Sequence, residues 1–334
     1  MREYQIKKII FSIFCFMASP IYAYQSSANF LTAPNNNSYY LFANLLYWNV
    51  SEAGADNWVQ DIGSAGVHQS TTVYGVPFDS DMGLRIGAGF NNASGWDASL
   101  YYTGYHTDAT DAQTGNLASA YLGNFWVNNT NGASFGPSYQ SADMNWDINL
   151  DSLDLAFGHE FIVKNIMSMH PFFGLKLASI NQDIKTNWYN PINTNNFTQG
   201  TEKITNDFNG IGPSVGIDLS FKLLSKTHYA LSILGSFSGA LMYGHWDLKD
   251  VYNNNQPVTK TIDNTDMTNV APMIDGFLGL QWTGYSTKIN TTVRIGYEEQ
   301  IWYDQLRFYS YNMGRLHDEL TLQGGTIDVN FNFK

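Results

Sequence analysis

The segment GIGPSVGIDLSFKLL, residues 210–224, alternates apolar and polar positions with a period of two. Its apolar residues occupy the odd positions from Ile211 to Leu223, and small or charged residues such as Asp218 and Lys222 occupy the even ones. This period predicts a β-strand with one apolar and one polar face. The strand is longer than the five or six residues usual in soluble sheets, so its apolar face packs against either a second protein layer or lipid.

The same alternation recurs along the chain and predicts a series of hairpins. A first strand near 39–50 and a last strand near 317–333 bring the count to ten. Tight turns are expected at 91–95, 164–166, 224–228 and 283–286, and long connections at 51–82, 107–143, 181–202, 250–268 and 302–316. An even number of antiparallel strands, joined alternately by tight turns and long loops, is typical of bacterial outer-membrane barrels.

We therefore predict an all-β transmembrane antiparallel β-barrel of about 10 strands, with tight periplasmic turns and long extracellular loops. The segment AYLGNFWV, residues 120–127, is weakly strand-like, and an extra strand pair there gives an alternative of 12 strands. The long connections are rich in Asn, Thr, Ser and Gly, which suits hydrated loops.

Two local irregularities need an explanation within this prediction. Trp146, Ile148 and Leu150 are at even positions, whereas the apolar positions from Leu153 onward are odd. We interpret this change of phase as a β-bulge near residues 151–152. Pro213 cannot donate a ladder hydrogen bond, so we expect it near the long-loop end of its strand.

Tryptophan positions favour a lipid-facing sheet. Six of the nine tryptophans fall where a predicted strand meets a connection, at the two levels expected for an interfacial aromatic belt. These are Trp48, Trp96, Trp146, Trp246, Trp282 and Trp302. A soluble sandwich has no reason to place them so regularly.

The N-terminus reads as an export signal. MREYQIKK precedes the apolar stretch IIFSIFCFMASPI and the small-residue site IYA, which predicts a signal peptide over 1–23 and a single barrel domain over 24–334. The only cysteine, Cys15, lies within the signal, so disulfides do not stabilise the exported domain. Removing Arg2, Lys7, Lys8 and Glu3 leaves 14 basic and 28 acidic side chains, a net charge of −14. This charge excludes nucleic acid as a partner.

The last strand, GGTIDVNFNFK, is amphipathic and has an aromatic residue just before its final Lys334. It resembles the signal that barrel-assembly machinery reads. Expected partners are therefore that machinery together with outer-membrane lipid and lipopolysaccharide. The sequence leaves open a homo-oligomer and the binding of host surface molecules by the loops.

Three blocks resemble the Legionella and Parachlamydia type of major outer membrane protein. They are LFANLLYWNVSEAG (41–54), PFDSDMGLRIGAGFNNASGWDASLYYTGYHTDA (from Pro77) and NWDINLDSLDLAFGHEFIVKNIMSMHPFFGLKLASINQDI (145–184). The resemblance implies an integral outer-membrane barrel at the surface of a Gram-negative bacterium that acts as a porin or an attachment factor. It implies no catalytic residues. Cysteine cross-linking, thought to occur in some relatives, is excluded by the lack of cysteine after residue 23.

If the apolar faces meet lipid, the intervening polar residues line the lumen. The candidate lumen-lining residues are Arg85, Asp97, Asp154, Lys176, Asp218, Ser220, Lys222, Arg294 and Glu298. The whole predicted inward face also includes Glu160, Asp275 and Asp328, so seven acids face four bases. This excess predicts porin-like passive diffusion of small solutes with a weak cation preference. The alternative is a lumen plugged by paired side chains in a structural or adhesive protein, because a barrel of about ten strands is narrow.

An outer-membrane hydrolase is the remaining alternative. His106 lies near the loop end of a predicted strand and close to Asp108 in sequence. A catalytic histidine needs an acid within hydrogen-bond reach and a nucleophile or activated water. The chain has no G-x-S-x-G, H-E-x-x-H or Cys/His metal spacing, so we predict no enzyme, cofactor or metal site.

Overall fold

The computed structural model describes residues 37–52, 57–62, 71–119, 138–163, 166–192, 197–254, 259–310 and 314–333. The predicted signal peptide, Cys15 and the strand-like segment 120–127 lie outside the described residues. No helix in the described part of the chain is long and apolar enough to cross a membrane.

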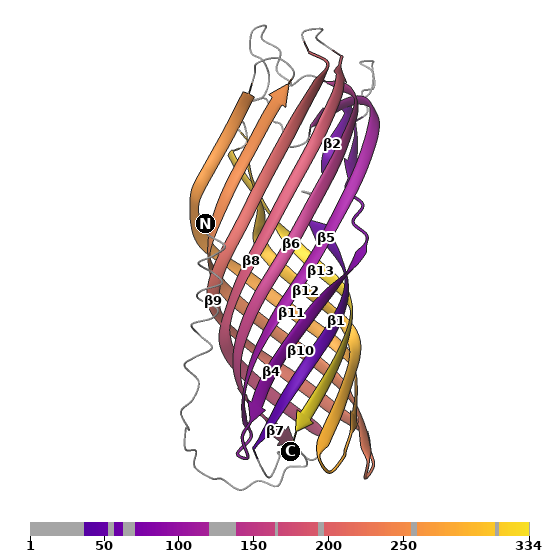
Figure 1. Cartoon of the computed structure of the whole chain (residues 1–334), viewed down its shortest axis with the longest axis vertical. Helices are drawn as coiled ribbons and strands as arrows, with labels where there is room; N and C mark the ends of the chain where they lie inside the picture. The colour runs from indigo at the N-terminus through magenta and orange to yellow at the C-terminus, as the bar shows by residue number, and fades with distance from the viewer. Residues whose placement is uncertain are drawn as a thin grey trace.

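The described residues form thirteen antiparallel strands in one sheet (Figure 1). The strands are β1 (Ser38–Glu52), β2 (Asn57–Ile62), β3 (Thr71–Gly75), β4 (Ser80–Asn91), β5 (Trp96–Ser119), β6 (Tyr139–His159), β7 (Phe161–Val163), β8 (Met167–Pro191), β9 (Gln199–Ser225), β10 (Tyr229–Asn254), β11 (Thr259–Gly284), β12 (Ile289–Ser310) and β13 (Gly314–Phe333).

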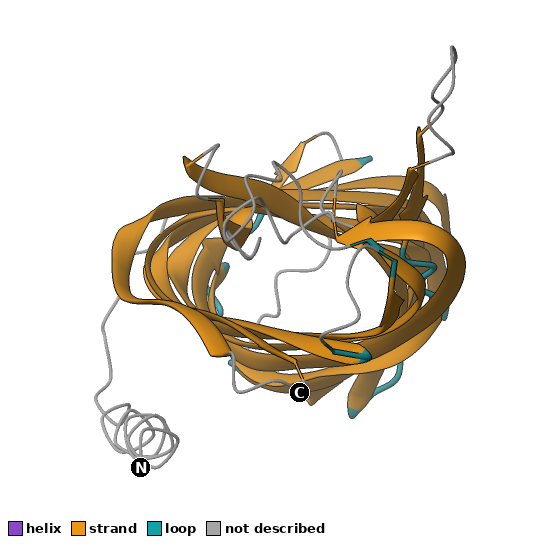
Figure 2. Cartoon of the chain, turned by 90° about the horizontal axis from the view of Figure 1, so that it is seen from above, coloured by secondary structure: helices purple, strands orange, loops and turns teal. Residues whose placement is uncertain are grey.

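Ten of these strands close into a barrel, which confirms the predicted fold class and strand number. The order around the barrel is β1-β4-β5-β6-β8-β9-β10-β11-β12-β13, and β13 pairs with β1 to close the ring (Figure 2). The short β7 adds to β8, and the β2–β3 hairpin extends the sheet beyond β5. We refer to the end with the short turns, where β4 leads into β5, as the turn end, and to the opposite end as the loop end.

The strands are much longer than a membrane requires. A membrane-spanning strand has about 9–11 residues, whereas β9 has 27 residues and β10 has 26. At about 3.3 Å per residue and a tilt of 35–45°, such strands make a barrel about 60–75 Å high. Only part of this height can lie in lipid.

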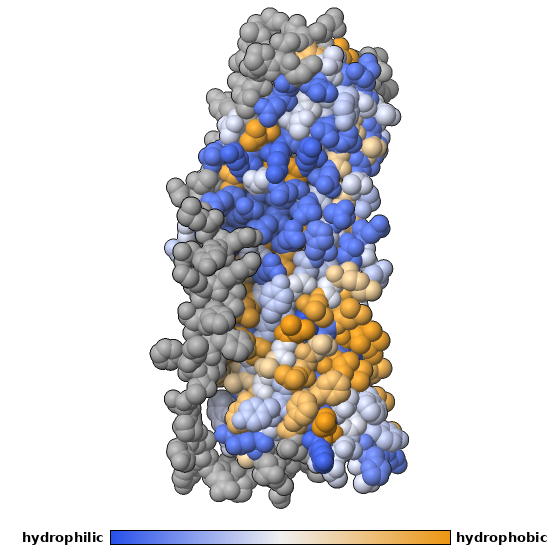
Figure 3. All heavy atoms as spheres, viewed as in Figure 1, coloured by the Kyte–Doolittle hydropathy of each residue, from blue (hydrophilic) through white to orange (hydrophobic). Residues whose placement is uncertain are grey.

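The outer surface divides into two zones along this height. Large exposed apolar side chains form an apolar band near the turn end, for example Phe237, Leu278 and Ile295 with exposures of 58%, 66% and 56%. Toward the loop end the outer face carries charged residues such as the exposed pair Lys203 and Asp183. Figure 3 shows hydrophobic side chains below and hydrophilic ones above on the face in view.

The inside of the barrel shows the opposite pattern, and this explains the change of phase in β6. Trp146, Ile148 and Leu150 are buried and point inward toward the loop end, and Asp154 continues on the same inward face. Leu153, like the apolar residues that follow it, belongs to the outward face of the apolar band. The pairing of β6 with β5 and β8 has no register shift at residues 151–152, so the predicted bulge is wrong.

The predicted long loops are largely strand. β8 continues to Pro191 and β10 to Asn254, so much of 181–202 and 250–268 belongs to the sheet. Polar residues face outward there, and the sequence therefore resembles hydrated loops although it alternates like a strand. Near the turn end of a strand the apolar residues of the alternation face outward, whereas near the loop end they face inward.

Pro213 lies in the middle of β9, not near its loop end as predicted. It pairs with Leu175 of β8, and on the other side the ladder between β9 and β10 is interrupted between Ser214 and Ile211. A proline has no N–H to donate to the ladder. The interruption of the ladder beside Pro213 accommodates this missing donor in the middle of the strand.

Candidate functional site

The residues predicted to line the lumen fall into several groups inside the barrel. Arg85, Asp97, Asp154, Lys176, Asp218, Arg294 and Glu298 each contact another inward side chain. Ser220 and Lys222 share a strand face with Asp218. Their role in the passage of solutes stays a prediction.

One group connects two parts of the barrel wall that are not neighbours in the sheet. Arg85 of β4 donates two hydrogen bonds to the Glu298 carboxylate of β12, with N···O distances of 2.6 and 3.3 Å. Its Nε donates to Thr103 at 3.0 Å, and Thr326 donates to Glu298 at 2.9 Å. Two strands, β1 and β13, lie between β4 and β12. A bidentate pair of this kind is among the stronger polar contacts in proteins.

The network continues toward β11. The Gln300 amide donates to Glu298 at 3.2 Å and to Asp275 at 3.1 Å, and Trp302 Nε1 donates to Gln300 at 3.3 Å. Each of these groups thereby satisfies hydrogen-bonding capacity that would be costly to leave unmet inside a protein.

The network meets the opposite wall through a lysine. Lys176 of β8 pairs with Asp154 of β6 at 2.7 Å, and its Nζ lies 5.7 Å from the centre of the Trp302 ring. Three strands, β9 to β11, separate β8 from β12 along the sheet. We call Arg85, Thr103, Asp154, Lys176, Glu298, Gln300 and Thr326 the polar layer. Its charged side chains are only 3–12% exposed, so the layer fills the lumen at this level.

A second charged group lies nearer the turn end. His170 of β8 contacts Asp97 of β5 through Nε2 at 2.5 Å and Asp218 of β9 through Nδ1 at 3.0 Å. Ser236 donates to the other Asp218 oxygen at 2.6 Å. The His170 side chain is 26% exposed and that of Asp218 37%, so this part of the lumen is open to solvent.

Arg294 completes the inward charges near the turn end. Its Nε is 3.8 Å from Asp328 and donates to Gln281 at 2.9 Å, and its side chain is 39% exposed. The exposure of Arg294 and His170 shows that the lumen on the turn side of the polar layer is accessible to solvent.

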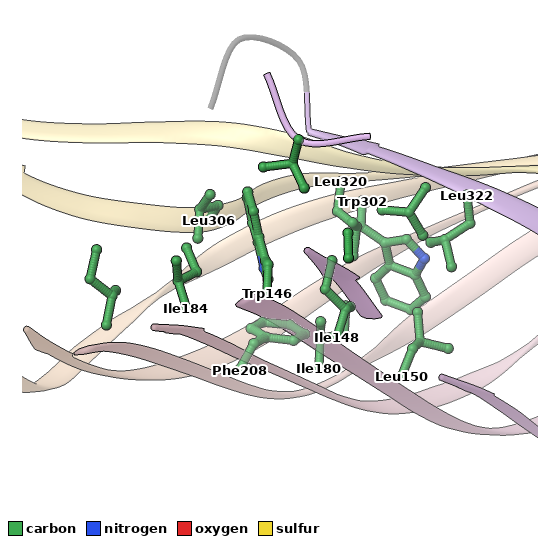
Figure 4. Close-up of a cluster of buried hydrophobic side chains, with 14 of the residues drawn as sticks. Trp146, Ile148, Leu150, Ile180, Ile184, Phe208, Trp302, Leu306, Leu320 and Leu322 are labelled. Atoms are coloured by element: carbon green, nitrogen blue, oxygen red, sulfur yellow. The ribbon is translucent and has the colours of Figure 1, made fainter. Parts of the chain in front are cut away.

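Apolar side chains fill the barrel on the loop side of the polar layer (Figure 4). We call this cluster the apolar plug. It includes Trp48, Trp146, Trp188, Trp246, Trp302, Phe208, Ile148, Ile180, Ile184, Leu306, Leu320 and Leu322, all 0–2% exposed. Figure 4 shows side chains of β6, β8 and β9 meeting those of β12 and β13. Trp48 joins the plug to the polar layer by donating to Thr326 at 3.2 Å.

The aromatic-belt prediction is wrong for four of its six residues. Trp48, Trp146, Trp246 and Trp302 are fully buried inside the barrel. They sit where β-strands cross from the apolar band to the charged outer zone, and there the inward face is the apolar one. Trp96 and Trp282 lie outside near the turn end with exposures of 49% and 43%, and for them the belt stays a prediction.

Buried acids lie among the plug residues. Glu52 is fully buried and accepts from Gln182 at 2.9 Å, whose own Oε1 accepts from Trp146 at 3.2 Å. Glu202, on the part of β9 beyond the apolar band, is 1% exposed and accepts from Ser119 at 3.3 Å. Burial, and then the charge of Asp250, raise the pKa of Glu202 well above its ordinary value.

The structure does not place the predicted hydrolase candidate His106 beside Asp108. His106 lies on the outer face beside Asn149, 2.9 Å away, and Asp147, 3.9 Å away, rather than beside Asp108. Among the described residues, no group of three or more histidine, cysteine, aspartate or glutamate side chains is arranged to hold a metal ion.

The apolar plug is the feature that sequence reasoning missed. Its signal is the even-numbered apolar run of Trp146, Ile148 and Leu150, for which the sequence alone suggests a bulge in a lipid-facing strand. The pairing of Arg85 with Glu298 could not be predicted, because residues 213 positions apart meet only once the barrel has closed.

A closed antiparallel barrel with an apolar outer band and an inward polar network defines the class of outer-membrane β-barrels. The chain belongs to the family described as Legionella pneumophila major outer membrane protein precursor, whose model matches residues 32–333. This membership places the protein in the bacterial outer membrane. Its short turns therefore face the periplasm and its loop end faces outward.

Comparison with solved structures gives barrels of low sequence identity. The outer membrane protease OmpT from Escherichia coli matches at 8% identity and a TM-score of 0.43, covering 89% of this chain and 96% of that chain. The translocator domain of the autotransporter NalP from Neisseria meningitidis matches at 9% identity and 0.35, covering 89% and 88%. The toluene transporter TodX from P. putida matches at 10% and 0.30, covering 90% of each. No curated protein matches the chain.

Proposed function

We propose that this chain is an outer-membrane barrel with a closed lumen that presents a rigid polar β-sheet surface outside the cell. The observation that carries the proposal is that the apolar plug packs on the polar layer inside the barrel. Side chains of the polar layer cross the lumen and connect β4 with β12 and β8 with β12. A conducting pore needs a continuous hydrated path, and an apolar constriction excludes water and ions.

The barrel size supports the same conclusion. A barrel of eight strands is just wide enough for side chains to fill its interior, whereas porins with a water-filled channel have 16–18 strands. Ten strands lie close to the filled limit, and bulky plug residues such as Trp146 and Trp302 contribute large volumes.

The second candidate is porin-like passive diffusion of small solutes with a weak cation preference. It is favoured by the inward acids, because Asp97, Asp218 and Asp275 add to the paired Asp154 and Glu298. Diffusion through this lumen requires the plug to move aside. Presentation of the outer zone to lipopolysaccharide or to host surface molecules is compatible with either candidate.

Conductance in a planar lipid bilayer distinguishes the candidates. We expect the purified, heat-modifiable protein to insert without a steady unit conductance. The double variant W146A/W302A removes two plug rings and should produce ion flow. The matched control W96A/W282A removes two tryptophans from the outer surface and should stay silent.

The opposite outcome is equally clear. Steady channels of the wild-type chain with a reversal potential that favours cations would replace the closed-barrel proposal by the porin candidate. A folded W146A/W302A variant that remains silent would show that the two rings do not close the lumen.

A further inference from the structure

A row of inward polar side chains crosses β1, β13 and β12 on the turn side of the polar layer. Asn44 pairs with Asp328 across β1 and β13, and Asp328 pairs with Arg294 across β13 and β12. Directly paired residues of neighbouring antiparallel strands have Cβ atoms about 4.5–5.5 Å apart. The three side chains are therefore adjacent, and we call them the inner row.

Two members of the inner row are buried acceptors that lack hydrogen bonds. Asn44 is 8% exposed and Asp328 is 5% exposed. In the described part of the chain, Oδ1 of each has no hydrogen-bond partner. The Nε atom of Arg294 lies 3.8 Å from Asp328 Oδ1, too far for a hydrogen bond, and donates to Gln281. Buried oxygens of this kind are costly unless a partner meets them.

The third member of the inner row supplies donors. A guanidinium has five N–H donors, four of them on its two Nη atoms. The Nη atoms of Arg294 make no hydrogen bond to any other residue that the structure describes, and its side chain is 39% exposed to the lumen of the turn end. A cationic donor thus lies beside a carboxylate and an amide oxygen that both lack donors.

Aromatic rings line the wall next to the inner row. Phe42 and Tyr40 follow Asn44 on the inward face of β1, and their rings stack with centroids 6.3 Å apart. A Cβ added at Gly87 would overlap the Phe42 ring, and one added at Gly89 would overlap the Tyr40 ring. The rings therefore lie against the wall over the glycines of β4. An apolar group inside the lumen can pack on their free faces.

We propose that the inner row binds a free α-amino acid with an apolar side chain that enters from the turn end. Its carboxylate accepts from the Nη atoms of Arg294, its ammonium donates to Oδ1 of Asp328 and Asn44, and its side chain packs on the two rings. An α-amino acid carries both charges on one carbon, which matches the short separation of Arg294 from Asp328.

A water molecule meets only part of this arrangement. It can donate to the two oxygens, but it offers neither a carboxylate to Arg294 nor an apolar group to the rings. Small-molecule sites combine an apolar or aromatic lining with a few placed polar groups in this way. The inner row lies on the turn side of the polar layer, so the proposal does not depend on whether the apolar plug closes the lumen.

Three related compounds test the proposal on the wild-type chain. L-phenylalanine has both charges, phenethylamine lacks the carboxylate, and 3-phenylpropanoate lacks the ammonium. Each is titrated calorimetrically into the full exported chain, folded in detergent, and into empty micelles. We expect one saturable site for L-phenylalanine and binding of the other two that is weaker by about 10-fold or more, the scale of a lost hydrogen bond between charged groups.

Two substitutions assign the two charges of the ligand. Asp328→Asn should weaken the binding of L-phenylalanine by about 10-fold and should not weaken that of 3-phenylpropanoate. Arg294→Met should weaken the binding of L-phenylalanine equally and should not weaken that of phenethylamine. Asp183→Asn, the same change on the outer face, is the matched control and should bind like the wild-type chain. Heat-modifiable migration confirms that each variant is folded.

Three outcomes would overturn the proposal. One is the absence of saturable binding of L-phenylalanine. Another is equal affinity of the wild-type chain for all three compounds, which would mean that the aromatic rings adsorb any phenyl group. The third is an unchanged affinity for L-phenylalanine in a folded Asp328→Asn or Arg294→Met variant. If one variant does not fold, the other variant and the three compounds on the wild-type chain still decide.

Discussion

At the scale of single residues, the lumen depends on positions where a side chain is missing. Gly158 of β6 lies between Asp97 of β5 and Phe172 of β8. A Cβ added there would lie 2.2 Å from His170 Nε2 and 3.1 Å from Asp97 Oδ2. The His170 ring therefore reaches Asp97 by passing over Gly158, and no other residue leaves room for this contact.

We expect Gly158→Val to displace the His170 ring from Asp97 and to destabilise the folded barrel by about 1–3 kcal/mol, the usual cost of overpacking. The midpoint of thermal unfolding in detergent, followed by heat-modifiable migration, measures the effect. Gly325→Val adds the same side chain in open space on the outer face and should leave the midpoint nearly unchanged. Equal midpoints for the two variants would contradict the close approach.

Glu202 gives a pH prediction outside the membrane. Its folded pKa is raised above the ordinary value of 4.5 by burial and by Asp250, so the folded state holds this proton more tightly than the unfolded state. The resulting stability is fully present below about pH 4.5 and is lost as the pH rises through the folded pKa. Glu202→Gln keeps the shape, and its side-chain oxygen can still accept from Ser119.

The variant should therefore be more stable than the wild-type chain at neutral pH, and the difference should shrink as the pH falls toward 4.5. Unfolding midpoints in urea over a pH series measure this difference. A difference that does not change with pH would show that Glu202 has the same pKa in the folded and unfolded states, which would contradict the raised folded pKa.

At the scale of strands, the sequence predicted the existence of the barrel strands but not their ends. The period of two over Leu153, Leu155 and Phe157 carries a clear outward signal. The same period applies to Trp146, Ile148 and Leu150, but these residues point into the barrel. A period of two does not indicate which face of a strand lies inside. A prediction from alternation alone therefore ends each strand at the level where the apolar face changes side and assigns the rest of the strand to a loop.

Paired charges show the same limit between strands. The inward character of Arg85 and Glu298 followed from alternation, but their partnership did not. In the closed barrel Glu298 pairs with Arg85, and Arg294 lies beside Asp328. Partners across a lumen depend on barrel closure and shear, which the local pattern does not encode.

The tie between β4 and β12 leads to a double-mutant prediction. Glu298→Ala leaves the Arg85 guanidinium buried without its carboxylate, so we expect a loss of about 3–5 kcal/mol in the free energy of unfolding. Arg85→Met alone should also be destabilising, because it leaves the Glu298 carboxylate inside the barrel without its cationic partner. The double variant R85M/E298A removes both charges and should recover most of the loss.

Unfolding in urea of the folded protein in detergent gives the three free energies. Additive effects of the two substitutions would mean that Arg85 and Glu298 do not act as a pair. The outward pair Lys203 and Asp183 is the control, since both side chains are more than half exposed and their coupling should be below about 1 kcal/mol.

At the scale of the whole molecule, the barrel is two structures joined end to end. Near the periplasm it has an apolar outside and a polar, partly hydrated inside. Toward the loop end it has a polar outside and an apolar core, like a soluble β-barrel. The polar layer lies at the junction, on the turn side of Trp48 and Trp302, and the side chains of its Arg85–Glu298 pair are 12% and 3% exposed. A strand needs only about ten residues to cross a membrane. The apolar core toward the loop end stabilises the remaining residues of these longer strands outside the membrane.

Cysteine labelling on whole cells tests where the membrane ends. The chain beyond residue 23 has no cysteine, so each introduced cysteine is unique. A membrane-impermeant maleimide should label Asp183→Cys and Lys203→Cys, which are outward and about half exposed above the apolar band. It should not label Phe237→Cys or Ile295→Cys, although both positions are more than half exposed in the isolated barrel, because lipid covers them. All four cysteines should react after denaturation. If Asp183→Cys and Phe237→Cys are both labelled on intact cells, the membrane boundary inferred from the two outer zones is wrong. If both are protected, another surface component covers the part of the barrel above the apolar band.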